Sequence, residues 1–345
     1  MDKTKAIEIQ KKLLELVFKS SERRQDIIDV LGELFHVGRA NIYKKVRGDT
    51  LLSLPEIIAV MQRFHISFDQ FVIDSKTNVE FFFPYLNNPI KRFVDYVAPL
   101  HKIVEEFALL PDIEIYYATA ELPFFYYYMS KPITAFKLYS YAHTTWQLPG
   151  YIDRKYNAEE FTEFVHLDPY IDGVIHNYYK MPNTELWNIN ILNNTLNQIK
   201  TFLRSGLFEK PEYSLVLLDE LRKLMKHVCS MAKHGKKFVL NKTEPNDHSA
   251  DFVLYHNEIA HTNNTLLVLS KHMNAVFTAF DNPNFIISRN PALVEHTFNW
   301  MKSIKQHSQP VTKDARNNRL YLFDQIEKRI LWTEEDIKAY LAKNR

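Results

Sequence analysis

The side chains best suited to specific chemistry lie between residues 39 and 47. The four basic members of this segment, with no acidic residue among them, are Arg39, Lys44, Lys45 and Arg47. Residues 1–75 together hold 12 basic and 11 acidic residues, so positive charge is concentrated in this short stretch. Arginine and lysine bind phosphates as cations, and arginine can also donate two hydrogen bonds to one guanine. The pattern indicates a surface for a polyanion such as duplex DNA, and a solvated charged face is the plain alternative.

A helix must hold these residues, and the sequence predicts one from Arg39 to Val46. Gly48 follows it and is a typical stop signal for a helix. The preceding helix begins near residue 25, and a break follows it at residues 36–38. The apolar positions of that preceding helix are Ile28, Leu31, Leu34 and Phe35.

Three further helices are predicted around this pair. The first covers residues 3–20, with Ile9, Leu13, Leu16 and Val17 on one face. Ser53 and Glu56 have the spacing of a capping box and begin the fourth helix. Ser67 caps a last short helix, in which Phe68 and Phe71 face inward. Residues 1–75 are therefore expected to form an all-α domain of five short helices.

The segment from residue 30 to residue 71 resembles the helix-turn-helix of the Cro/cI-repressor-like (Xre) family. The apolar positions of the motif are occupied by Leu31, Phe35, Val37 and Ile42. The runs LSLPEII and HISFDQF match the family's last two helices, and Gly32 matches a position that needs a small residue. His36 departs from the glycine that is frequent in the turn, and Gly38 departs from the usual polar N-cap. The resemblance implies a lambda-repressor-like domain that binds DNA.

Under this resemblance, the helix from Arg39 to Val46 is the recognition helix and enters the major groove. Arginine at position 39 suits guanine, and Asn41 suits adenine. Lys44 could reach a base or a phosphate, whereas Lys45 and Arg47 are expected to contact phosphates, which position the protein without reading sequence. The predicted DNA-binding residues are Arg39, Ala40, Asn41, Lys44, Lys45 and Arg47.

The rest of the chain has a different pattern. Residues 76–90 are rich in Phe, Pro and Asn and are predicted to be a linker. Residues 91–345 are predicted to form an α+β domain of no recognised family. Strand-like runs rich in aromatic and β-branched residues are found at 112–119, 124–130, 133–143, 252–259, 265–269, 275–280 and 285–288. Helices are predicted at 90–110, 185–205, 212–233 and 291–305, and from residue 316 onward.

An aromatic cluster in the large domain could line a pocket for a small effector, because such pockets are mostly apolar with a few polar groups. The residues predicted for this pocket are Tyr117, Glu121, Tyr127, Tyr139, His143 and Trp146. Two other interpretations remain open, which are a β-rich core with tyrosines at its edge and a dimer surface.

No convergent set of catalytic or metal-binding residues is recognisable, so the sequence predicts no enzyme activity, metal or cofactor. The single cysteine, Cys229, lacks an identifiable base and reads as structural. His234, Lys236 and Asn241 approach the HxKxxxxD signature of phospholipase D-like enzymes, but the last position holds Asn and only one copy is present. The run from Asn284 to Ile304 vaguely resembles the strand-then-helix ending of inactive phospholipase D-like sensor domains.

The composition of the chain excludes several further classes of protein. The chain has only 7 glycines and neither a GxGxxG nor a GxxxxGK[ST] motif, which argues against a nucleotide-binding loop. No secretion signal or long apolar run is found, so a cytoplasmic location is expected. The sequence thus predicts a transcriptional regulator that binds double-stranded DNA as a homodimer, with a small molecule as a candidate effector. The alternatives are a hydrolase with a DNA-targeting module and a protein-interaction scaffold.

Overall fold

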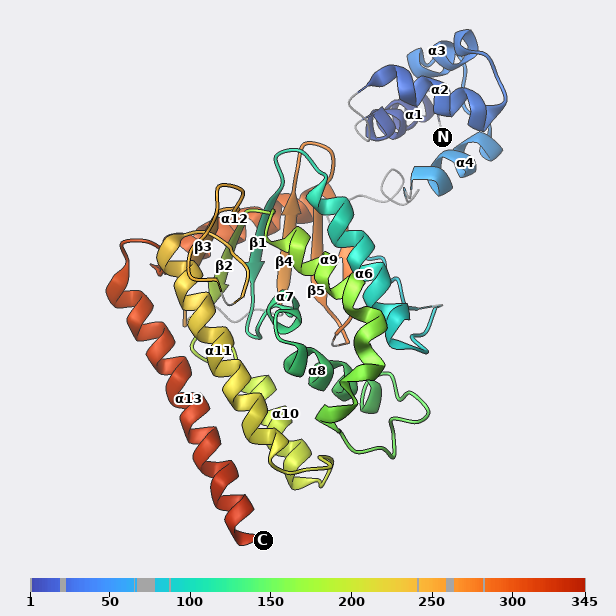
Figure 1. Cartoon of the computed structure of the whole chain (residues 1–345). Helices are drawn as coiled ribbons and strands as arrows, with labels where there is room; N and C mark the ends of the chain where they lie inside the picture. Colours follow the sequence, from blue (N-terminus) through green and yellow to red (C-terminus); the bar gives the residue numbers. More distant parts are fainter. Residues whose placement is uncertain are drawn as a thin grey trace.

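The computed structural model has an N-terminal group of helices and a C-terminal mixed α/β domain (Figure 1). It describes residues 2–18, 23–64, 66, 78–86, 88–240, 242–258, 264–281 and 283–344. The helix predicted to begin at Ser67, with Phe68 and Phe71, lies outside these residues.

The N-terminal helices pack around a core of their own. They are α1 (Lys3–Phe18), α2 (Arg24–Phe35), α3 (Arg39–Arg47) and α4 (Leu54–Phe64). The buried side chains of this core are Leu13, Leu14, Val17, Ile27, Ile28, Leu31, Ile42, Leu52 and Val60. All four helices contribute to the cluster, so amphipathic helices too short to be stable alone stabilise one another. The first four helices of the sequence prediction are confirmed.

The described part of the large domain is built on a seven-stranded sheet with the order β6-β5-β4-β1-β2-β3-β7. Its strands are β1 (Glu114–Ala118), β2 (Asn183–Trp187), β3 (Phe252–His256), β4 (Thr265–Leu269), β5 (Ala275–Ala279), β6 (Phe285–Ser288) and β7 (Gln309–Pro310). The β1, β2 and β3 strands are parallel, whereas β4, β5 and β6 form an antiparallel run that joins the sheet beside β1. The sheet is therefore mixed.

Helices cover both faces of this sheet (Figure 1). One face packs on α12 (Pro291–Gln306), through Val294 and Met301. The other face carries the main core and most of the remaining helices. These are α6 (Phe93–Ala108), α7 (Phe124–Tyr128), α8 (Lys131–His143), η1 (Ala158–Leu167), α9 (Asp168–Tyr178), α10 (Asn193–Arg204) and α11 (Tyr213–His234). The last helix, α13 (Arg316–Lys343), packs against α10 and α11.

The prediction of strands at 124–130 and 133–143 is wrong, because these residues form α7 and α8. Every residue from Ile133 to Ala142 is buried. A helix that is buried all round has no polar face, so the helical period disappears and the aromatic and β-branched residues resemble a strand. The β2 strand was also missed, since the helix predicted from residue 185 begins only at Asn193. The strands predicted near residues 112, 252, 265, 275 and 285 are confirmed.

The second half of the predicted linker packs on the large domain. Phe82 pairs with Ile287 of β6 in an isolated β-bridge, and Ile90 is buried in the main core. Within the part of the chain that the structure describes, no helix has the length and apolar character needed to cross a membrane.

Candidate functional site

The α2 and α3 helices are joined by a sharp turn. His36 adopts the left-handed conformation (φ 54°), at the position where the resembled family often has glycine. The backbone N–H of Val37 donates to the carbonyl of Gly32 (3.0 Å). A Cβ added at Gly32 would lie 3.2 Å from the Val37 oxygen, a tight contact with the backbone of the turn, so this position favours a small residue.

A single side chain of α3 is fully buried. Ile42 has no exposed surface, and it packs in the core of the small domain. The exposed positions of the helix are Arg39, Ala40, Asn41, Tyr43, Lys44 and Arg47. The α3 helix therefore lies on the domain through one apolar anchor and presents its polar and basic side chains outward.

A buried glutamine fixes the end of α3. Gln10 of α1 is 5% exposed, and its Nε2 donates to the carbonyl oxygens of Lys45 (2.7 Å) and Thr50 (2.9 Å). Its Oε1 accepts from the backbone N–H of Leu52 (2.6 Å). These bonds tie the end of α3 and the segment that follows it to α1. The signal in the sequence is a lone amide on the apolar face of α1.

The basic residues of α3 are not equivalent. Arg39 forms two hydrogen bonds to the carboxylate of Asp29 (2.7 and 2.8 Å), with its side chain 63% exposed. Arg47 pairs with Asp49 (2.8 Å), also at the surface. Lys44 is exposed and makes no ion pair with any residue that the structure describes. The positive charge on the exposed face of α3 thus comes from two arginines in surface ion pairs and one lysine without an ion pair to a described residue.

Lys45 points toward α4 instead of outward. Its Nζ lies 2.9 Å from Glu56 and 3.3 Å from the Leu51 carbonyl, and its side chain is 15% exposed. Burial raises the pKa of Glu56, but hydrogen bonds from Lys45 and Ser53 outweigh it and hold the pKa below its usual value. The Glu56 carboxylate also accepts from the N–H of Ser53, as the capping box predicted. Lys45 is therefore a weaker candidate for a phosphate contact than the sequence suggested.

Tyr43 belongs to the exposed face of α3 although the sequence analysis omitted it. It is 41% exposed. Ala40, Tyr43, Lys44 and Arg47 have the spacing i, i+3, i+4, i+7 and so form one stripe of the helix. A tyrosine on this stripe can contact sugar and phosphate groups through its hydroxyl. The spacing from Ala40 was the signal that could have identified it.

The residues predicted for an effector pocket are mainly core residues. Glu121 binds Tyr127 (3.2 Å) and Lys137 (3.1 Å) in a buried group. Tyr139 stacks on His143 with ring centroids 5.8 Å apart. Burial raises the pKa of the phenol of Tyr117. The Trp146 ring packs 5.1 Å from the ring of Tyr96. The six residues are thus distributed over separate contacts of the core, in which α7 and α8 are buried helices and not the strands of a β-rich core, and effector binding by them stays a prediction.

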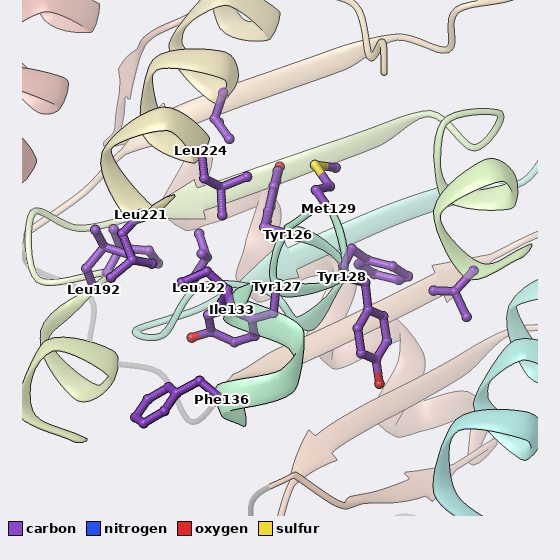
Figure 2. Close-up of a cluster of buried hydrophobic side chains, with 14 of the residues drawn as sticks. Leu122, Tyr126, Tyr127, Tyr128, Met129, Ile133, Phe136, Leu192, Leu221 and Leu224 are labelled. Carbon is purple, nitrogen blue, oxygen red and sulfur yellow. The ribbon is translucent and has the colours of Figure 1, made fainter. Parts of the chain in front are cut away.

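The tyrosines of α7 illustrate why this region is core. Figure 2 shows Tyr126, Tyr127 and Tyr128 with their hydroxyl groups directed to three different sides. Tyr126 donates to Glu185 (3.0 Å), a carboxylate with no exposed surface whose pKa is raised by burial. Lys137 is buried too, and burial lowers its pKa. The large domain therefore keeps charged groups inside, where hydrogen-bonded partners offset their desolvation.

The phospholipase D-like signature does not converge in the described residues. The Nδ1 of His234 bonds the Ser230 carbonyl (2.8 Å), and Lys236 pairs with Asp251 (3.0 Å). Asn241 lies outside the described residues. Burial raises the pKa of the Cys229 thiol. In the described ranges, no three His, Cys, Asp or Glu side chains are grouped as a metal site would require.

Comparison with known proteins gives no match, whether with family models, with curated proteins or with solved structures.

Proposed function

We propose that this chain is a sequence-specific regulator of transcription that binds double-stranded DNA through α3. The observation that carries the proposal is the combination of α2, a sharp turn and α3, with α3 held by Ile42 and its polar and basic side chains directed outward. This is the arrangement of a helix-turn-helix, in which the second helix enters the major groove. The small domain is lambda-repressor-like under this proposal.

The exposed face of α3 has the chemistry that groove binding needs. Asn41 can pair with adenine, and Arg39 can pair with guanine. Arg39 must first break its ion pair with Asp29. Such a surface pair contributes about 0–1 kcal/mol, so Arg39 can readily exchange Asp29 for a base. Lys44 and Arg47 supply positive charge for phosphates, and Tyr43 supplies a hydroxyl.

The large domain, residues 91–345, would dimerise the protein, respond to a ligand, or both. Dimers of this motif bind two half-sites about one helical turn of DNA apart, which increases both affinity and specificity. A ligand could act only by favouring one placement of the two recognition helices.

The test is selection of binding sites from random duplex DNA with the full-length protein at several salt concentrations. We expect enrichment of a palindromic motif, whose half-site spacing gives the distance between the two α3 helices. On the enriched duplex, Arg39→Ala is expected to weaken specific binding by roughly 1–3 kcal/mol. Lys12→Ala, at an exposed lysine of α1, is the matched control and should affect binding little. If no motif is enriched, or if Arg39→Ala and Lys44→Ala both bind like the parent, α3 is not a DNA-reading helix.

A further inference from the structure

The last helix has an exposed face whose residues are arranged symmetrically. Buried side chains on one side of α13 include Leu322, Ile326 and Ile330, which face the domain. The outer side and its flanks carry four large apolar residues, which are Leu320 (55% exposed), Tyr321 (50%), Leu331 (43%) and Trp332 (61%). The Tyr321 ring also contacts His256 of β3, with ring centroids 5.8 Å apart. Between the four apolar residues lie Asp324 and Lys328, also exposed and 2.8 Å apart. Figure 1 shows α13 at the outer edge of the domain beside α11.

A second copy of the same helix fits this face. When two α13 helices cross antiparallel with a two-fold axis at the level of Ile326, the axis reverses height along the helix and keeps each residue on its own flank, so Leu320 of one copy meets Leu331 of the other. By the same symmetry, Tyr321 meets Trp332, and near the centre of the face Asp324 meets Lys328. Each apolar residue therefore meets an apolar residue, and each charge meets its opposite. Self-complementarity of this kind is what an isologous two-fold interface requires.

We propose that the exposed face of α13 is the homodimer interface of this protein. The interface is inferred from the residues of α13 alone. Only its role, which is to pair two recognition helices, rests on the proposed function. One helix from each copy buries an area near the small end of specific interfaces, about 1,000 Å² in all. The dimer is therefore expected to dissociate in the micromolar range.

The test is sedimentation velocity of the full-length chain over a concentration series, without DNA. Asp324→Lys places two lysines opposite two lysines across the axis, and Lys328→Asp places aspartates opposite aspartates. Each variant alone is expected to be monomeric at a concentration where the parent is dimeric. An equimolar mixture of the two is expected to form a heterodimer, since the chain with two lysines then faces the chain with two aspartates.

Lys102→Asp is the control for Lys328→Asp, because it makes the same charge change at an exposed site on α6. The proposal is overturned if the parent is monomeric throughout, if the single variants dimerise like the parent, or if mixing them restores nothing. Far-UV circular dichroism of each variant verifies folding. A DNA-binding monomer would reject the α13 interface alone, and a dimer that selects no DNA motif would reject the proposed function alone.

A cavity of about 550 Å³ lies between α6, the antiparallel strands and the segment before α6. Its apolar lining includes Phe82, Ile103, Phe107, Phe277 and Ile287. A second hollow of about 70 Å³ shares four of these residues. In its lining, the Oδ1 atom of Asn284 is buried and has no hydrogen-bond partner. The cavity and this hollow together thus combine aromatic walls with one unsatisfied acceptor.

The charges at the mouth of the cavity decide the kind of ligand. Glu80, Glu106 and Arg289 line it, so the carboxylates outnumber the cation. None of the three forms an ion pair with a described residue. Aromatic rings and carboxylates together favour a lipophilic cation, which gains both cation–π attraction and charge neutralisation. We infer that this cavity binds a lipophilic cation of small-molecule size.

The cavity also lies on the connection between the two parts of the chain. Phe82 exchanges two backbone hydrogen bonds with Ile287 (2.7 and 2.9 Å), so its segment forms one wall of the cavity as an added edge of the sheet. A ligand against Phe82 would therefore touch the chain that leads to the DNA-binding helices. An effector role for the ligand rests on the proposed function, whereas binding itself does not.

The probe is tetraphenylphosphonium, compared by calorimetry with tetraphenylborate, an anion of nearly the same shape. The full-length protein is expected to bind the cation more tightly than the anion. Glu106→Gln should weaken cation binding several-fold, and Glu105→Gln, an exposed neighbour outside the lining, should not. Ile103→Trp, which fills the cavity, should abolish binding of both probes. Equal binding of the two probes, no binding of either, or loss with Glu105→Gln as large as with Glu106→Gln would overturn the site. Because the assay contains no DNA, its failure leaves the proposed function untouched.

Discussion

The α3 and α8 helices carry lysines in opposite environments. On α3, Lys44 is exposed, and the ion pairs of Arg39 and Arg47 lie at the surface. On α8, Lys137 is 3% exposed at its side chain and is held by Glu121 and Gln198 (2.9 Å). The charges of Arg39, Lys44 and Arg47 on α3 therefore face solvent, whereas Lys137 of α8 joins buried segments of the large domain. A charged residue in the sequence does not by itself indicate which of these two uses it has.

The largest expected effect tests the buried side of this comparison. Lys137→Met leaves the carboxylate of Glu121 buried without its cation, which costs roughly 3–5 kcal/mol for a broken buried pair. Lys44→Met on α3 should change unfolding free energy by less than about 0.5 kcal/mol. Tryptophan fluorescence in urea measures the large domain for the Lys137 variants, because all tryptophans lie at or after residue 146, and hydrogen exchange of the α3 amides measures the small domain for Lys44→Met. The double variant Glu121→Gln with Lys137→Met should recover part of the lost unfolding free energy. An equally small loss in Lys137→Met and Lys44→Met would contradict the comparison.

The next effect concerns Gln10, the one buried polar side chain among the described residues of the small domain. Gln10→Ala removes the hydrogen bonds to the backbone of residues 45, 50 and 52 and leaves buried groups partly unsatisfied. We expect a loss of about 1–3 kcal/mol in the stability of the small domain. Hydrogen exchange of the amides from residue 42 to residue 52 measures it. Lys12→Ala on the exposed face of α1 is the control, and equal exchange in both variants would show that Gln10 does not hold the end of α3.

The same contrast explains what could be predicted from the sequence. In the small domain, apolar residues recur at helical spacing between polar residues, as Ile28 and Leu31 do in α2 and Ile42 and Val46 in α3, so helix positions and the exposed face of α3 were predictable. In the large domain, residues 133–142 are all buried, so no period separates helix from strand. The pairing of Lys45 with Glu56, and the clamp by Gln10, depend on contacts between residues distant in the sequence. Spacing along one helix cannot show them.

A smaller and favourable effect is expected in the turn. His36 has φ 54°, where a Cβ is unfavourable and glycine is not. His36→Gly should therefore stabilise the small domain by about 0.5–1 kcal/mol. His36→Ala keeps the Cβ and should give no gain, which makes it the matched control. Hydrogen exchange of α2 and α3 compares them, and equal stability of the two variants would mean that the left-handed turn carries no strain.

The smallest expected effect lies at the exposed pair of Arg39 with Asp29. Asp29→Asn should change stability by no more than about 1 kcal/mol, since a surface ion pair contributes little. The same change releases Arg39 and removes a negative charge beside it, so affinity for the selected duplex should rise slightly, and more at low than at high salt. Asp26→Asn, an exposed aspartate on the same helix, controls for the charge alone. If both variants raise affinity equally, the effect is general electrostatics. If Asp29→Asn alone raises it, Asp29 competes with DNA for Arg39, and this surface pair is part of the reading of DNA.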